Sequence, residues 1–196
     1  MIAFLVTLKP VAAVRSAMLI VAIPLALGAA PAASADLGFP HCAASFDTLL
    51  GNEVFNRYPA SLPHALKPVA PDVRNGKPRL YRTVIRDEAK QEPNFAGHYI
   101  LIRIGCGAAT VCPAIMDART GKVFFPPGLV NAEGLLMDTG DADIEALNYR
   151  KDSRLLVVVG TPNENLKNEG MSYYLWRSDK LVLIRFVPRA ELCGKD

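Results

Sequence analysis

Short apolar runs separated by turn residues dominate the C-terminal two thirds of the chain. Residues 97–105 (GHYILIRIG) form a β-branched run, and residues 154–160 and 181–187 are apolar at almost every position. Runs of this length, bounded by turn residues, are typical of buried β-strands. Further strands are expected at residues 79–87, 112–117, 122–125, 144–149 and 172–177. The chain is therefore predicted to be mainly β.

The connections between these strands are too short for parallel pairing. Tight turns are expected at residues 118–121 (ARTG), 150–153 (RKDS) and 178–180 (SDK). No helix-length periodic segment separates the strands, as a parallel sheet would require. We expect a single-domain antiparallel meander, a sandwich-like sheet whose doubly apolar strands need cover on both faces.

The N-terminal part of the mature chain has a different pattern. In residues 44–55, apolar positions recur at helical spacing, which predicts one helix. Prolines interrupt the rest of residues 36–78, at positions 40, 59, 63, 68, 71 and 78. We expect this helix and proline-rich segment to cover the β domain of residues 79–196, with residues 36–196 forming one folded unit.

The first 35 residues have the three parts of a secretory signal peptide. Lys9 and Arg15 are followed by an apolar run over residues 17–30 and by the small residues Ala33-Ser34-Ala35. The run is shorter than a membrane span of about 20 residues. We expect cleavage before Asp36, no membrane span after cleavage, and a periplasmic or secreted protein.

The charge pattern excludes one class of partner. The formal net charge of the chain is +3, and it falls to +1 when Lys9 and Arg15 are removed, with no block of like charge in the remainder. Nucleic acid is therefore not an expected partner. The expected partner is an unknown protein or envelope component, and the sequence leaves the oligomeric state open.

Four cysteines lie in the mature part of the chain: Cys42, Cys106, Cys112 and Cys193. An even number in an exported chain favours disulfides. We expect Cys106–Cys112 to close a short loop between two strands, and Cys42–Cys193 to join the two ends of the domain. A zinc site is the alternative, but the C-x5-C spacing does not match the usual ligand pairs.

One segment resembles a recurrent pattern. The string NFAGHYILIRIGCG, followed by Cys112 and by MDARTGKV, covers residues 94–123. It resembles a family of small exported bacterial proteins for which no activity is known. The resemblance implies export and a compact domain, and it transfers no catalytic residue.

The segment around the short-range disulfide is the candidate binding loop. Glycines flank Cys106, and the loop consists of small residues: Gly105, Gly107, Ala108, Ala109, Thr110 and Val111. A loop fixed by a disulfide loses little entropy when it binds a partner. The alternative is a purely structural crosslink at a turn.

His98 and Asp138 are the candidate polar site. Asp138 lies in LLMDTG, which resembles an aspartic protease segment, but that mechanism needs two aspartates and the chain has one such segment. Asp138, Asp141, Asp143 and Glu145 also form an acidic run that could bind calcium, although the EF-hand spacing is absent. No catalytic residue, cofactor or metal ligand is assigned.

Together these patterns predict an exported, non-catalytic binding or inhibitor-like protein of the bacterial envelope. The alternative is an envelope hydrolase whose catalytic residues the sequence does not identify. A hollow in which His98 meets another titratable group would favour the enzyme, and an exposed loop would favour the binding protein.

Overall fold

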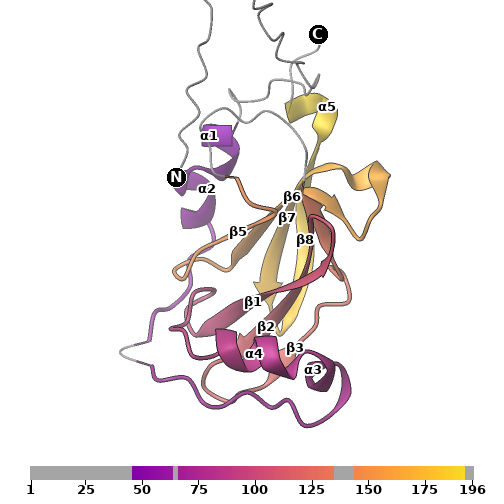
Figure 1. Ribbon diagram of the computed structural model, residues 1–196. Coiled ribbons are helices and arrows are strands. Elements are labelled where there is room, and N and C mark those ends of the chain that lie inside the picture. Colours follow the sequence, from indigo (N-terminus) through magenta and orange to yellow (C-terminus); the bar gives the residue numbers. More distant parts are fainter. Residues whose placement is uncertain (1–45, 64–65, 135–143, 193–196) are drawn as a thin grey trace, which may run out of the picture. The chain divides into compact units, whose positions relative to one another are not determined.

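The computed structural model describes residues 46–63, 66–134 and 144–192, and these residues form a single antiparallel sheet of eight strands with short helices (Figure 1). The expected mainly β, antiparallel fold is confirmed. The strands are β1 (Tyr99–Gly107), β2 (Thr110–Asp117), β3 (Val123–Phe124), β4 (Ala132–Gly134), β5 (Leu147–Tyr149), β6 (Leu155–Pro162), β7 (Gly170–Arg177) and β8 (Lys180–Pro188).

A three-residue strand that the sequence did not predict joins the two halves of the sheet. The strand order is β1-β2-β4-β6-β7-β8, with β3 on β2 and β5 on β6. Strand β4 pairs with Thr110 and Val111 of β2 on one side, and with residues 160–162 of β6 on the other. The topology is therefore a meander with β4 inserted between its two long hairpins.

Both long hairpins have two-residue turns. In β7–β8 the turn is Ser178-Asp179, and both residues have positive φ, as in a type I′ turn. Lys180, expected in the turn, begins β8. In β1–β2 the turn is Ala108-Ala109, so Thr110 and Val111, expected in a loop, belong to β2.

The doubly apolar strand β6 separates two hydrophobic clusters. Leu155, Val157 and Val159 lie in one cluster, and Leu156 and Val158 lie in another, as alternation along a strand requires. The second cluster also holds Leu101 of β1, Ile115 of β2, and Tyr174 and Trp176 of β7. The two halves of the sheet therefore share one core, and the aromatic residues of β7 fill it.

The N-terminal helix is broken into two short helices. α1 (Phe46–Leu50) and α2 (Asn52–Asn56) replace the single expected helix of residues 44–55, because Gly51 adopts an extended conformation between them. Leu49, Leu50, Val54 and Phe55 pack in the cluster on the outer face of β6 and β7. These side chains of the segment therefore cover part of this face of the sheet.

The prediction of a strand at residues 79–87 is wrong. These residues lie mainly in α3 (Gly76–Leu80) and α4 (Arg82–Glu88), near β1 and β2 (Figure 1). The strand prediction placed Leu80 and Val84 on one face and Tyr81 and Ile85 on the other. Residues four apart also share a face of a helix, so this spacing fits either element. Only Ile85 is buried, with Ala89 four residues later, and both pack under β1 and β2. A short 3-10 helix (Leu166–Asn168) and α5 (Arg189–Leu192) complete the described elements.

Candidate functional site

The NFAGHY motif forms a tight turn that leads into β1. The side chain of Asn94 accepts a hydrogen bond from the Leu101 amide (2.8 Å) and donates one to the Leu101 carbonyl (3.3 Å). Ala96 and Gly97 both have positive φ, and the Phe95 amide bonds back to the Tyr99 carbonyl. The motif therefore fixes the position of His98 beside the first residue of β1.

Two motif glycines hold the proline-rich segment against the sheet. A Cβ atom on Gly97 would lie 2.2 Å from the Ser61 carbonyl oxygen, and one on Gly121 would lie 2.2 Å from that of Ala70. The Asp72 amide also donates to the Gly121 carbonyl at 2.8 Å. Both glycines have positive φ, so close approach and backbone conformation each require glycine there.

His98 is the centre of a polar group that we call the His98 cluster, made of His98, Tyr99, Asp117, Arg119 and Asp179. His98 Nε2 lies 3.8 Å from Asp117 Oδ1, and that oxygen accepts the Arg119 amide at 2.8 Å. The Tyr99 hydroxyl donates to Asp179 Oδ1 at 3.4 Å. Three turns, from NFAGHY, DARTGK and β7–β8, thus bring their polar side chains together.

The cluster keeps His98 and Tyr99 in their neutral forms. Burial lowers the pKa of His98, and the Arg119 charge lowers it further, while Asp117 and Asp179 partly oppose both effects. Burial likewise raises the pKa of Tyr99. His98 Nε2 is enclosed and has no hydrogen-bond partner among the residues that the structure describes. At neutral pH His98 is therefore an uncharged imidazole.

A hollow of about 510 Å³, which we call the His98 hollow, opens beside this cluster. Its wall includes both His98 and Asp179, which is the kind of arrangement expected to favour the enzyme alternative. Asp138, the other residue of the candidate polar site, lies outside the described residues. Asp141 and Asp143 of the acidic run also lie there, and the calcium hypothesis stays a prediction.

The candidate binding loop lies at the opposite end of the β1–β2 hairpin. The expected Cys106–Cys112 disulfide is present, with Cα atoms 5.9 Å apart. The register of the strands shifts between Gly105 and Gly107, which leaves Cys106 in a bulge. Residues 105–109 are exposed, and β4 partly covers Thr110 and Val111. The second expected disulfide, Cys42–Cys193, lies outside the described residues.

A second hollow, of about 440 Å³, lies beside this tip. Backbone and small side chains of the loop form one wall, and residues 145–147 form the other. An ion pair between Arg103 and Glu145 links the two walls.

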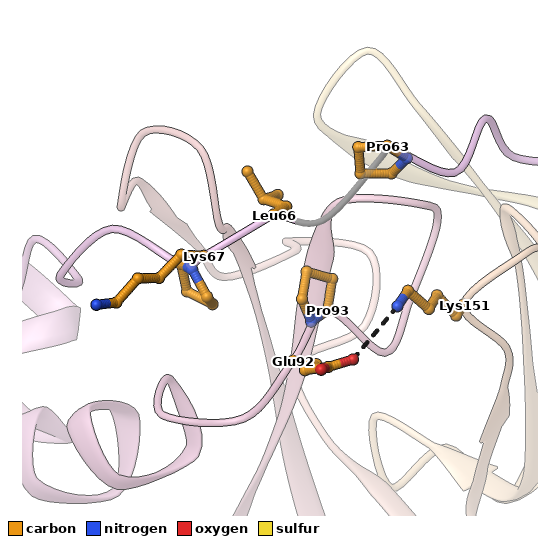
Figure 2. Close-up of a pocket in the computed structure, with 7 residues that line it drawn as sticks. Pro63, Leu66, Lys67, Glu92, Pro93 and Lys151 are labelled. Atoms are coloured by element: carbon orange, nitrogen blue, oxygen red, sulfur yellow. Dashed lines mark ion pairs between the residues drawn. The ribbon is translucent and has the colours of Figure 1, made fainter.

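A third hollow, of about 370 Å³, lies under the proline-rich segment (Figure 2). Pro63, Leu66 and Pro93 give it apolar walls, and a Glu92–Lys151 ion pair of 3.6 Å crosses its edge. Residues 64–65, beside it in the chain, are not described. This hollow contains none of the predicted site residues.

Sequence reasoning missed most members of the His98 cluster. Asp117 and Arg119 were visible in the DARTGK string, but nothing in the string alone assigned them to His98. The expected Cys106–Cys112 disulfide carried only part of the signal, because it predicts a hairpin but centres it on residue 109, which would pair residue 99 with residue 119. The bulge at Cys106 shifts the register, so that Tyr99 pairs with Asp117. Asp179 comes from a distant hairpin, and no sequence signal indicated it.

Comparison with known proteins adds no assignment: no protein family matches the chain, and neither a curated protein nor a solved structure is similar to it at a significant level. The resemblance of residues 94–123 to small exported proteins therefore stays a prediction. Among the described helices, none is long and apolar enough to cross a membrane.

Proposed function

We propose that this protein is an exported, non-catalytic binding protein of the envelope, and that the tip of the β1–β2 hairpin inserts into its partner. The observation that carries the proposal is the exposed tip itself, residues 105–109, closed by the Cys106–Cys112 disulfide. A closed tip keeps its conformation in the free protein, so binding costs little ordering entropy. The disulfide also agrees with an oxidising compartment, and hence with export.

The shape of the tip supports a partner with a narrow cleft. Ala108 and Ala109 form the turn, and neither has a side chain that must be ordered. Strands β1 and β2 anchor the tip through Ile102, Ile104 and Ala114, which are buried. The adjoining hollow between the loop and residues 145–147 would receive a side chain of the partner.

The hydrolase alternative rests on the His98 hollow. Ser61 and Ser178 line this hollow together with His98, and Asp117 lies behind the imidazole. A nucleophilic mechanism needs a hydroxyl bonded to the histidine. No such bond occurs in the described part of the chain, and Asp117 Oδ1 already accepts the Arg119 amide. We therefore place binding before hydrolysis.

The test begins with recovery of the partner. The exported protein, immobilised in its oxidised form, is used to capture components from an envelope extract of its host, and each captured component is purified. Its affinity is then measured for the wild type and for Ala108→Arg, which places a long side chain at the tip. We expect at least a tenfold loss of affinity with an unchanged unfolding midpoint, because Ala108 is exposed.

Two further variants separate tip binding from general effects. Ala190→Arg, at an exposed alanine of α5, should leave affinity unchanged. Replacing both Cys106 and Cys112 by serine should lower stability by about 2 kcal/mol, as expected for so short a closed loop. It should also lower affinity under conditions where the variant is fully folded. Equal affinity for wild type and Ala108→Arg would exclude the tip as the binding element.

A further inference from the structure

The His98 hollow has the composition of a ligand site independent of the hairpin tip. It lies at the other end of β1, about 25 Å from the disulfide, given the rise of an extended strand. Its wall carries two arginines, Arg154 and Arg177, against one aspartate, Asp179. The excess of positive charge suits a ligand with an anionic group.

The two arginines are available to a ligand, whereas the aspartate is already engaged. Arg154 Nε donates to the Pro59 carbonyl at 3.2 Å, which fixes the side chain and leaves its two terminal nitrogens. Arg177 is exposed and makes neither an ion pair nor a side-chain hydrogen bond within the described ranges. Asp179 accepts the Tyr99 hydroxyl and lies 3.8 Å from Lys122 Nζ. The wall of the hollow therefore presents two arginine charges that can pair with an anionic group of a ligand.

The remaining wall is polar and partly aromatic. Ser61 and Ser178 both line the hollow. The half-buried ring of Tyr99 forms an apolar part of the wall, and it meets the core residue Trp176 edge to face, with centroids 5.2 Å apart. A ligand with hydroxyl groups, one carboxylate and an apolar ring face would match these groups together. Such a ligand is an acidic sugar, and a volume of about 510 Å³ is enough for one or two sugar rings.

The walls are fixed before any ligand arrives. The Gly97 amide donates to the Lys151 carbonyl at 2.6 Å, and the Ala96 amide donates to the Ser153 carbonyl at 3.2 Å. The Trp176 amide donates to the Arg154 carbonyl at 2.8 Å. The segments bearing His98, Arg154 and Trp176 are thus bonded to one another, which lowers the ordering cost of binding.

We propose that the His98 hollow binds an acidic sugar, with the carboxylate held between Arg154 and Arg177 and the ring against Tyr99. Arginine is suited to this role because its planar group donates two parallel hydrogen bonds to a carboxylate. His98 lies in the wall of the hollow beside Tyr99, with its Nε2 enclosed. The site does not depend on the hairpin tip, so either proposal can fail without the other.

The experiment titrates the folded, oxidised protein with glucuronic acid while backbone and side-chain NMR shifts are recorded. Binding should shift the Tyr99 ring signals and the Arg154 and Arg177 guanidinium signals, and leave the amides of residues 105–112 unchanged. Glucose should bind at least tenfold more weakly, because it lacks the carboxylate. Arg177→Gln should weaken glucuronic acid binding at least tenfold, and Arg177→Lys should weaken it less.

Matched controls make each outcome decisive. Arg86→Gln, at an exposed arginine of α4, should bind glucuronic acid like the wild type. Equal binding of glucose and glucuronic acid would overturn the role of the arginines. Equal binding of acetate or inorganic phosphate and glucuronic acid would overturn the sugar site in favour of a simple anion site. Absence of shifts in the His98 hollow at tens of millimolar ligand would overturn the proposal entirely.

Discussion

The carbonyl oxygen of Ser61 lies so close to Gly97 that a Cβ atom at position 97 would meet it at 2.2 Å. Gly97 also has a φ of +85°, which residues with a side chain rarely adopt. The NFAGHY motif thus needs its glycine because the proline-rich segment passes directly over it. This contact links the N-terminal cover to the wall of the His98 hollow.

Gly97→Ala is therefore expected to destabilise the protein by about 2 to 4 kcal/mol, because the backbone strain and the steric clash add. Chemical denaturation of the purified variant measures the loss. Gly105→Ala is the matched control, since a Cβ there has no neighbour within 4 Å and the residue has no positive φ. Similar losses in both variants would show that the Ser61 contact does not account for the requirement at position 97.

Ser153→Ala tests the attachment of α2 to the sheet. The buried Ser153 hydroxyl donates to the Phe55 carbonyl at 2.8 Å and accepts the Leu155 amide at 3.2 Å. Alanine would leave both backbone groups without this partner, so we expect a loss of about 1 to 3 kcal/mol in the free energy of unfolding. Thr83→Ala, at an exposed position of α4, should change stability by less than about 0.5 kcal/mol. A Ser153→Ala variant as stable as wild type would contradict the role of this hydroxyl.

His98 makes stability depend on pH. Its pKa in the folded protein lies below the ordinary value of 6.5, because burial and Arg119 disfavour the imidazolium. Below about pH 6.5 the unfolded chain binds the proton more readily than the folded one, so stability is lost as the pH falls towards the folded-state pKa. Above about pH 6.5, the ordinary value that the unfolded chain keeps, the contribution is fully present.

The measurement compares wild type with His98→Gln in urea at about pH 7.5 and about pH 5. We expect the wild type to lose more stability than the variant over this interval, since glutamine does not titrate and His41 and His64 are common to both chains. Equal losses in the two proteins would mean that His98 titrates alike in the folded and unfolded states.

The two edges of the sheet differ in their protection. On β1, the Asn94 side chain forms hydrogen bonds with the Leu101 amide and carbonyl, so these backbone groups cannot pair with another strand. On β8, the consecutive residues Val182, Leu183 and Ile184 are 47%, 52% and 40% exposed, and the backbone bonds described for the strand run to β7. An exposed apolar edge strand is prone to pair with other chains.

Leu183→Lys is thus expected to reduce aggregation at high concentration and to cost less than about 0.5 kcal/mol of stability, because the side chain is half exposed. Light scattering during a thermal ramp, together with the unfolding midpoint, checks both parts. Thr83→Lys, which adds the same charge on α4, is the control for a general charge effect. If both variants reduce aggregation equally, β8 is not the aggregating edge.

The fold class, most strands of the sheet and the short-range disulfide could all be predicted from the sequence. Strand β6 could be predicted because five consecutive apolar residues are unfavourable in water, and the short turn at 150–153 requires antiparallel pairing with β5. The turn expected at 178–180 likewise predicted the antiparallel pairing of β7 with β8. Cys106 and Cys112 were readable as a pair because two strands of one hairpin bring them together.

Two features depend on the tertiary structure. One is whether the apolar residues of 79–87 form a strand or a helix, and the other is the position of strand β4. Leu80 and Ile85 are both apolar, but the underside of β1 and β2 accepts only Ile85, so burial selected the helix. Ala132-Glu133-Gly134 has no strand propensity of its own, and it is a strand because two unpaired edges meet it.

The candidate sites divide in the same way. The hairpin tip is local, so its glycines and cysteines indicated it directly. The His98 hollow draws on residues 61, 98, 154 and 177–179, which lie far apart in the sequence. Local pattern and spacing constrain only near neighbours, whereas the meeting of three turns depends on strand order and register. Strand order and register depend on the packing of the whole sheet. The sequence therefore indicated His98 but not the residues that surround it.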